Sequence, residues 1–478
     1  MTVRAVTHRV RRAHRWLVRN LRPGDDGCGT FSWVRRGLVV LALASATLPD
    51  GAAAEWGRPK QIAPWGDEPL ACSTGEVVFG NGARQRFSYV RWSAGAFSRI
   101  RRLPQLPGRT TDPELACDGR GRFLVAVVQG RRISVARSAP SGAWSRLRSV
   151  SSPRRDVGPP ELAVSLSGRA IVAYPARTRR GWRVEASTRA RRDGRFGSPR
   201  VLSASGPDYP SVDVAIGQRG DALVTWHVEQ EADGLLTGSE GPVWASFKPA
   251  GGRWAPAQAL GDGGEFSSLS SAVSPTGRML VAWLPWYYGT RGTEEPSRLM
   301  IAERAPGGAF AGARELARST PGAVEDGGPV TSVADDGRAL VAWVRPAGPI
   351  AFGTGLSTVE AFARPAGGDF TSETLTSPDG VPEFPVLSVR RDGALALGWT
   401  QASPGGVRVV FSLGELGARL GRPRPVSSRR DEPTWPTVAF AGTGDLIAAW
   451  LKGGFGSGEV MAAVDHGRDV GHSAAAGG

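Results

Sequence analysis

Short apolar runs recur along the chain, each following a glycine in a polar turn. In six copies an aromatic residue lies six positions after that glycine. These pairs are Gly168/Tyr174, Gly220/Trp226, Gly277/Trp283, Gly337/Trp343, Gly393/Trp399 and Gly444/Trp450. Gly121/Val127 keeps the spacing without the aromatic residue, and Gly75 marks a shortened first copy. A repeat of roughly 50 residues is typical of propeller blades, because helical solenoid units run to roughly 33 to 47 residues.

Each copy predicts four strands. The inner strand begins near a proline and alternates in polarity, as in 385–389. The glycine turn then leads into a second strand that is apolar almost throughout, as in 340–343, which is typical of a strand covered on both faces. A third strand and a fourth strand that opens with an aromatic residue complete the copy.

The copies predict an all-β chain that forms a single eight-bladed β-propeller over residues 55–464, followed by a disordered tail over 465–478. Eight inner strands but only seven outer strands follow in order. The missing outer strand is the segment Trp56–Ile62 at the front, which we expect to pair with Val460–Val464 and close the ring. A seven-bladed ring remains the alternative, with the degenerate first copy packed irregularly.

The first 54 residues have the pattern of a signal peptide or leader. Basic residues precede the apolar run Leu38–Leu48, and the small residues of 52–54 offer a cleavage site. That run is shorter than the about 20 apolar residues of a membrane span. We expect a secreted or cell-envelope protein without a transmembrane span in its mature form.

The formal net charge of +15 suggests nucleic-acid binding until its distribution is considered. Nine arginines against three aspartates lie in the first 54 residues, so the rest of the chain carries about +9. The remaining basic residues are scattered, apart from short groups such as Arg189–Arg195. The sequence therefore predicts no nucleic-acid partner, and we expect a monomer.

Two of the three cysteines, Cys72 and Cys117, occupy the same inner-strand position in consecutive copies. Neighbouring blades bring such positions close together, and an exported protein meets an oxidising compartment. We predict a disulfide between them, with two buried free thiols as the alternative.

Acidic residues recur just ahead of the inner strands, on the face where the outer-to-inner connections lie. The candidates for ligand binding among them are Asp112, Asp208, Glu265, Asp326, Glu383 and Glu432. Two interpretations remain. The carboxylates form a ring around the axial mouth that captures a ligand or cation, or they accept backbone hydrogen bonds in a turn that repeats.

Three loops between second and third strands are long, over 229–241, 284–297 and 345–356. The middle loop contains Trp286, Tyr287 and Tyr288, with Glu294 close by. Aromatic faces beside carboxylates suit sugar rings, which present apolar C–H patches together with hydroxyls. Packing of the loop onto its neighbour is the other interpretation.

No residue set reaches a catalytic or metal-binding signature. The tryptophans that end the second strands are expected to pack between sheets. Only His227, His466 and His472 remain after the leader, which gives no support to a histidine-based catalytic or metal site. The sequence predicts no cofactor and no metal.

The repeat rhythm and the outer-strand turns resemble the bacterial exported propellers of the sialidase-like, Asp-box type. The segments that carry this resemblance are 138–144, which is similar to Ser-x-Asp-x-Gly-x-x-Trp but lacks the Asp and is one residue short, and Asp193-Gly194-Arg195-Phe196. The resemblance implies a propeller fold and, in its sialidase members, an arginine cluster with a Tyr/Glu pair and an Asp. These catalytic residues cannot be assigned to positions of this sequence.

Two hypotheses follow. The first is a non-enzymatic binding module that holds a glycan or a protein ligand on the loop face. The alternative is a sialidase-like glycoside hydrolase or lyase that uses carboxylates of that face.

Overall fold

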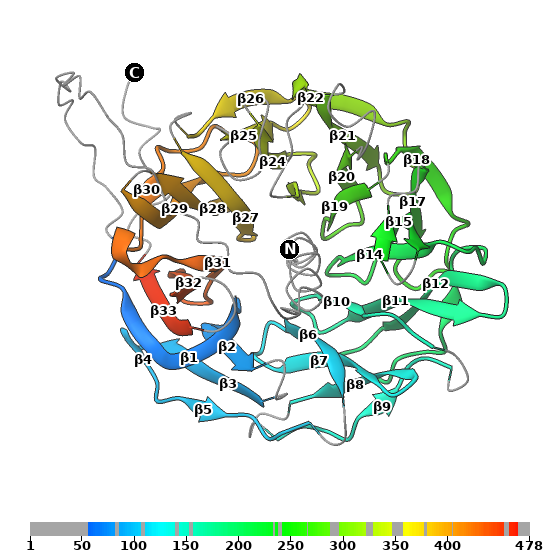
Figure 1. Ribbon diagram of the computed structural model, residues 1–478, viewed down its shortest axis with the longest axis horizontal. Helices are drawn as coiled ribbons and strands as arrows, with labels where there is room; N and C mark the ends of the chain where they lie inside the picture. The colour runs from blue at the N-terminus through cyan, green and yellow to red at the C-terminus, as the bar shows by residue number, and fades with distance from the viewer. Residues whose placement is uncertain are drawn as a thin grey trace, which may run out of the picture.

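The computed structural model describes residues 56–81, 86–106, 110–138, 143–152, 156–232, 235–237, 241–264, 266–286, 296–321, 328–346, 357–376, 380–403, 405–453 and 458–466, and the structural statements below concern these residues. The fold is all-β. Antiparallel sheets are arranged around a central axis, so that the chain forms a ring (Figure 1). The only helical element of the described residues is the short 3-10 helix η2 (Arg429–Asp431).

Six separate sheets follow one another around the ring, and each runs outward from an inner strand. Their strands are β6 (Thr111–Cys117), β7 (Phe123–Gln129), β8 (Arg132–Arg137) and β9 (Arg148–Ser149); β10 (Glu161–Val164), β11 (Ala170–Thr178), β12 (Gly181–Arg189) and β13 (Arg200–Val201); β14 (Tyr209–Ile216), β15 (Ala222–Ala232), β16 (Leu235–Thr237), β17 (Pro242–Lys248) and β18 (Gln258–Asp262); β19 (Phe266–Val273), β20 (Met279–Trp286), β21 (Pro296–Arg304) and β22 (Arg314–Pro321); β23 (Val330–Val333), β24 (Ala339–Pro346), β25 (Ser357–Arg364) and β26 (Thr371–Thr374); and β27 (Val381–Val389), β28 (Ala394–Ser403), β29 (Gly406–Glu415) and β30 (Arg424–Pro425).

The remaining strands belong to one larger sheet that contains both ends of the described chain. They are β31 (Thr434–Phe440), β32 (Leu446–Lys452), β33 (Gly458–Asp465), β1 (Lys60–Ala71), β2 (Glu76–Asn81), β3 (Arg86–Ser93), β4 (Ala96–Phe97) and β5 (Arg101–Arg102). Figure 1 shows β1 and β33 side by side, at the two ends of the colour scale.

The predicted contact between the two ends of the chain is present. The first part of β1 pairs with β33, with Lys60 opposite Ala462, and Gly57 N donates to Val464 O at 2.8 Å. The second part pairs with β2, with Leu70 opposite Val78. The sequence suggested two separate strands here, but one continuous strand serves both neighbours. Pairing the two ends leaves neither as an unprotected sheet edge.

The C-terminal boundary differs from the prediction. Asp465, which the sequence assigned to the tail, is the last residue of β33 and is buried. His466 follows it, with its ring 5.6 Å from that of Trp92 and its Nδ1 3.4 Å from Asp445 Oδ1. The last sheet is therefore longer than the alternation of apolar residues indicated.

The glycine turns behave as predicted. All eight glycines that define the repeat have positive φ, between 70° at Gly121 and 102° at Gly393. A side chain with a Cβ is disfavoured in this conformation, so glycine is the residue that allows the tight reversal between inner and second strands.

The second strands form the packing layer between the sheets. Five of the six recurring aromatic residues are fully buried, namely Tyr174, Trp283, Trp343, Trp399 and Trp450. The sixth, Trp226, is 2% exposed. This confirms that the recurring aromatic residues are core residues, whose large apolar surface stabilises neighbouring sheets against each other. His227 is likewise buried, with Nε2 3.0 Å from Gly264 O.

The predicted disulfide between Cys72 and Cys117 is present, with a Cα–Cα distance of 6.0 Å. It joins the segment after β1 to the end of β6 across two adjacent sheets. In the described part of the chain, no helix is long and apolar enough to cross a membrane.

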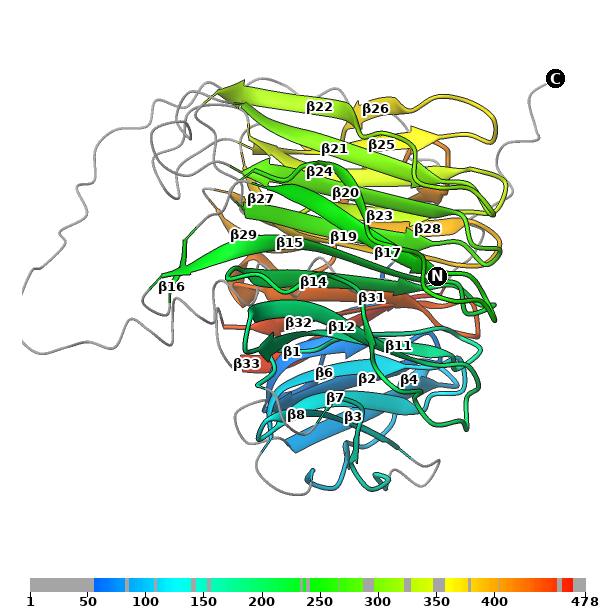
Figure 2. The same cartoon turned by 90° about the vertical axis from the view of Figure 1, so that its right-hand side faces the viewer.

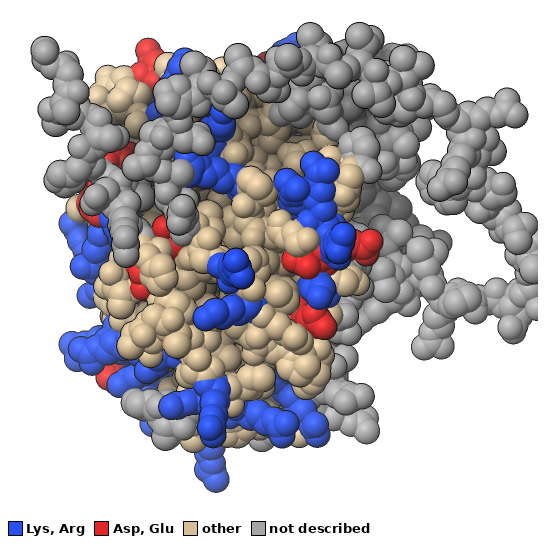
Figure 3. All heavy atoms as spheres, turned by 90° about the vertical axis from the view of Figure 1, so that its left-hand side faces the viewer, with Lys and Arg blue, Asp and Glu red and all other residues tan. Residues whose placement is uncertain are grey.

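Basic side chains are spread over the molecule. On the rim that carries β30, β33 and β4, they occur in separate groups with fewer acidic side chains between them (Figure 3). The side view shows β16 projecting at one end of the ring, where the connections between second and third strands lie (Figure 2).

Candidate functional site

Six of the predicted ligand-binding residues cannot be placed as side chains. Trp286 is the last residue of β20, where its backbone pairs with Phe266, and its side chain is outside the described set. The other five lie outside the described residues altogether: Tyr287, Tyr288, Glu294, Glu265 and Asp326.

The four other predicted carboxylates lie at the starts of inner strands. Asp112 is the second residue of β6 and Glu383 the third of β27, and both are half-buried. Asp208 directly precedes β14 and is half-buried, while the exposed Glu432 follows η2, shortly before β31. Because every inner strand starts at the same end of the ring, these carboxylates lie on one face, around the axial mouth.

At this mouth four inner strands share an irregularity that the sequence analysis missed. In β1, β6, β27 and β31, three residues of the inner strand span the space of two residues on the second strand. These β-bulges lie between Asp67 and Leu70, Thr111 and Glu114, Glu383 and Val386, and Thr434 and Thr437.

In each bulge two residues of the inner strand lie opposite one residue of the second strand, and the second of the two is a proline. The four are Pro69, Pro113, Pro385 and Pro436. Proline has no N–H group to donate to the ladder, so a bulge, where pairing is interrupted, accommodates it. The prolines that the sequence analysis assigned to strand starts therefore have a more specific role in these four strands.

The residue before the proline is strained in three of the bulges. Asp112, Phe384 and Trp435 have φ values of 48°, 54° and 53°. Positive φ is uncommon for residues with a side chain and costs of order 1 to 3 kcal/mol, so the surrounding structure must hold it in place. Phe384 and Trp435 are buried with their ring centroids 4.6 Å apart, which supplies that support.

The four bulged strands are neighbours in the ring. β27 packs against β31, and β31 against β1. Ala71 N donates to Thr437 Oγ1 at 3.2 Å between the last two, and the Cys72–Cys117 disulfide ties β1 to β6. We call β27, β31, β1 and β6 the bulged arc.

The inner strands β14, β19 and β23 pair with their second strands without interruption, and we call them the uninterrupted arc. β10 is itself regular, but directly ahead of it Val157 bridges Ala176 while Glu161 pairs with Ala173, so an extra residue is inserted there too. Proline alone does not produce the bulge, since Pro210 in β14 lies directly opposite Val228 in a regular register. The ring is therefore asymmetric at its mouth although its repeats are alike.

The bulged arc brings carboxylates and an interrupted backbone ladder together. A bulge turns backbone groups away from the partner strand and re-aims the side chains beside it. Asp112 and Glu383 lie in two of these bulges, and Glu432 precedes a third. Such an acceptor-rich rim suits a ligand that carries several hydroxyl donors.

The sequence carried only a partial signal for the bulges. A bulky or acidic residue followed by proline occurs in all four of these inner strands, as Glu68-Pro69, Asp112-Pro113, Phe384-Pro385 and Trp435-Pro436, but also as Tyr209-Pro210 in the regular strand β14. Because the residue before a proline is itself restricted in conformation, this pair indicates a local departure from a regular strand.

The ring of outward-running antiparallel sheets defines the chain as a β-propeller. No protein-family model and no curated protein sequence matches it. Similar solved structures include a polysaccharide lyase, the PL25 ulvan lyase, at 11% identity, covering 75% of this chain and 96% of that chain with a TM-score of 0.45. The NanB sialidase from Streptococcus pneumoniae has 9% identity, with 86% and 93% covered and a TM-score of 0.35.

A protein from Lactobacillus plantarum is similar at 15% identity, with 74% of this chain and 96% of that chain covered and a TM-score of 0.44. No functional conclusion follows from similarity at this level.

Proposed function

We propose that the chain is an exported, non-enzymatic β-propeller that binds a glycan, or a protein of the cell envelope, at the mouth of the ring. The observation that carries this proposal is the bulged arc, with strained backbone at Asp112, Phe384 and Trp435. Backbone strain that persists against its cost clusters at binding sites and active sites. Its restriction to one side of the mouth favours an oriented ligand.

We further infer that the ring has eight blades. In support, β1 pairs with β33 through its first half and with β2 through its second half, so it can serve two blades at once. An experimental structure viewed along the axis tests this count. Seven radial sheets would contradict it.

Export is part of the proposal and rests on the leader pattern of residues 1–54 together with the disulfide. Mass spectrometry of protein recovered from outside the cytoplasm should give a chain that starts near Glu55. Recovery of the full chain from the cytoplasm would contradict export.

A glycan-array screen with a parallel assay of product release tests the binding function. We expect binding without turnover. Glu383→Gln and Asp112→Asn should each weaken it by about tenfold, because hydrogen bonds to charged groups are lost. Asp208→Asn, at the same place in the uninterrupted arc, is the matched control and should bind normally. Trp286→Ala tests the contribution of the aromatic loop.

The alternative is a hydrolase or lyase that uses carboxylates of the mouth. Turnover that a single carboxylate substitution abolishes would establish it and overturn the non-enzymatic function. If the ligand is a protein, the test is how much of one envelope protein is captured by wild type and by Glu383→Gln. Asp208→Asn is the control.

A further inference from the structure

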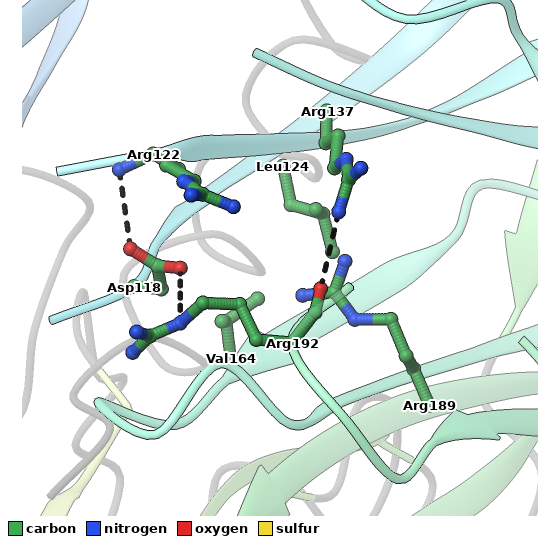
Figure 4. Close-up of a pocket in the computed structure, with 7 residues that line it drawn as sticks. All are labelled: Asp118, Arg122, Leu124, Arg137, Val164, Arg189 and Arg192. Atoms are coloured by element: carbon green, nitrogen blue, oxygen red, sulfur yellow. Dashed lines mark hydrogen bonds and ion pairs between the residues drawn. The ribbon is translucent and has the colours of Figure 1, made fainter. Parts of the chain in front are cut away.

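A second candidate site lies at the other end of the strands, where inner strands turn into second strands. A small pocket between the β6 and β10 sheets is lined by the carboxylate of Asp118 and by the guanidinium groups of Arg122, Arg137, Arg189 and Arg192 (Figure 4). We call it the arginine pocket. Arg137 and Arg189 enter it from the ends of β8 and β12, the third strands of the two sheets.

The carboxylate of Asp118 accepts hydrogen bonds within its own turn. Its Oδ1 accepts from the backbone N–H of Arg120 at 2.8 Å and of Arg122 at 3.2 Å, and its Oδ2 lies 2.9 Å from Arg192 Nε. Its side chain is 4% exposed. This carboxylate therefore neutralises one guanidinium group and organises the turn.

The second carboxylate near the pocket is Asp193, which is largely exposed. Its Oδ1 accepts from Arg122 Nη1 at 2.8 Å and from Arg137 Nη1 at 2.7 Å. The hydrogen bond from Arg122 is the main cause that lowers the pKa of Asp193, helped by the charge of Arg137. Four guanidinium groups thus face two carboxylates, which leaves an excess of positive charge.

Arg189 is the most buried member of the pocket. It is 4% exposed, its Nη2 donates to Gly168 O at 2.8 Å, and its Nε, like the Nε of Arg304, has no hydrogen-bond partner. Burial, followed by the charge of Arg137, lowers the pKa of Arg189 to about 10. A buried donor without a partner beside a second cation is costly unless an anion is supplied.

Arginines at the same strand position in other sheets show which contact of Arg189 is structural. Arg304 and Arg364 also end third strands, and they donate to the carbonyl groups of Gly277 and Gly337 at 3.1 and 2.9 Å. This contact fixes the glycine turn in each sheet.

The surroundings of these arginines differ. Arg364 Nη1 has both carboxylate oxygens of Glu303 at 2.6 and 2.7 Å. Arg189 instead has Arg137 as its main charged neighbour. Arg364 also has a second guanidinium group, that of Arg314, beside it, but there the carboxylate of Glu303 pairs with both.

We propose that the arginine pocket binds one oxyanion group, a carboxylate, sulfate or phosphate, which is either a free ion or a substituent of an acidic saccharide. Guanidinium groups match the paired oxygens of such anions with parallel N–H donors. The anion would bridge Arg189 and Arg137 and offset the excess charge.

Isothermal titration calorimetry at pH 7 and low ionic strength tests the proposal, with sodium sulfate, sodium phosphate, sodium acetate and sodium glucuronate as probes. We expect saturable binding of at least one probe, weakened by added sodium chloride. Arg189→Gln and the more exposed Arg137→Gln should each weaken it by about tenfold or more. Tighter binding of glucuronate than of acetate would indicate that the anion is a saccharide substituent. Equal binding of the two would indicate a free anion.

Arg304→Gln is the matched control, because Arg304 has the same strand position and the same 4% exposure. It should lose stability as Arg189→Gln does, yet retain wild-type affinity. If Arg189→Gln fails to fold, Arg137→Gln carries the test. The proposal is overturned if no probe binds wild type saturably, or if the pocket variants bind as tightly as Arg304→Gln.

This proposal is independent of ligand binding at the mouth, since the two sites lie at opposite ends of the strands. Glu383→Gln should leave anion binding unchanged, and Arg137→Gln should leave array binding of neutral glycans unchanged. The failure of either proposal is therefore visible without reference to the other.

Discussion

The bulged arc and the uninterrupted arc are built from the same repeat, but their inner strands start differently at the mouth. In the uninterrupted arc, β14 pairs with β15 from Tyr209 to Ile216 without a break. In the bulged arc, each inner strand inserts an extra residue, and Phe384 and Trp435 are held at positive φ by buried packing. A common core can thus support a regular rim on one side and a strained rim on the other.

The largest effects should come from the shared core and should be equal in the two arcs. Trp399, in the β27 sheet, and Trp343, in the β23 sheet, are both fully buried. Replacing either by Ala should lower the free energy of unfolding by about 3 to 5 kcal/mol, because a large cavity forms. Urea unfolding followed by circular dichroism measures this. A much smaller loss for Trp399→Ala would mean that the bulged arc is poorly packed and its strain unsupported.

The disulfide should affect the bulged arc alone. Cys72 and Cys117 are 45 residues apart, and loss of the bond in the double Ser variant should cost about 3 to 4 kcal/mol. Hydrogen exchange should quicken in β1 and β6 and stay slow in β14 and β23. Equal loss of protection around the ring would show that the two arcs are not separable units.

Glycine substitutions should have opposite signs in the two arcs. Asp112→Gly should raise the free energy of unfolding by about 1 kcal/mol, because glycine adopts its φ of 48° without strain. Asp208→Gly should lower it by about 0.5 kcal/mol, since its φ is not positive and glycine adds entropy to the unfolded chain. Thermal unfolding compares the pair. Destabilisation by both substitutions would remove the argument from strain.

The smallest effect concerns the junction where the ring closes. Burial acts to raise the pKa of Asp445, but hydrogen bonds from Trp92 and Thr443 and the nearby His466 outweigh it and lower the pKa. Trp92 Nε1 donates to Asp445 Oδ2 at 2.8 Å between β3 and the β31–β32 turn.

A carboxylate with a lowered pKa contributes stability above its unfolded pKa of about 3.9, and that stability is lost as the pH falls through the lower folded value. The loss should stay below about 1 kcal/mol, since solvent still screens this half-buried carboxylate in part. The difference in free energy of unfolding between wild type and Asp445→Asn, followed by tryptophan fluorescence at a series of pH values, should be constant above about pH 4 and shrink as the pH falls below it. An unchanged difference from pH 6 to pH 2 would contradict this linkage.

Much of the fold could be predicted because its signals are local or repeat. The Gly-to-aromatic spacing identified the turns and the core tryptophans, and the matched positions of Cys72 and Cys117 identified the disulfide. The contact between Trp56–Ile62 and Val460–Val464 followed from counting strands.

The rim could not be predicted in the same way. Pro210 and Pro385 look alike in the sequence, yet only Pro385 lies in a bulge, because the register depends on how neighbouring sheets pack. The arginine pocket was hidden for a related reason. The group Arg189–Arg195 was visible, but Arg122 and Arg137 join it only through contacts between two sheets.

The most direct test of the central claim is the affinity of a glycan identified on the array for Glu383→Gln and for Asp208→Asn, measured side by side by calorimetry. The bulged arc as ligand site predicts about tenfold weaker binding for Glu383→Gln and wild-type binding for Asp208→Asn. Equal affinities of the two variants, or a loss confined to Asp208→Asn, would contradict it.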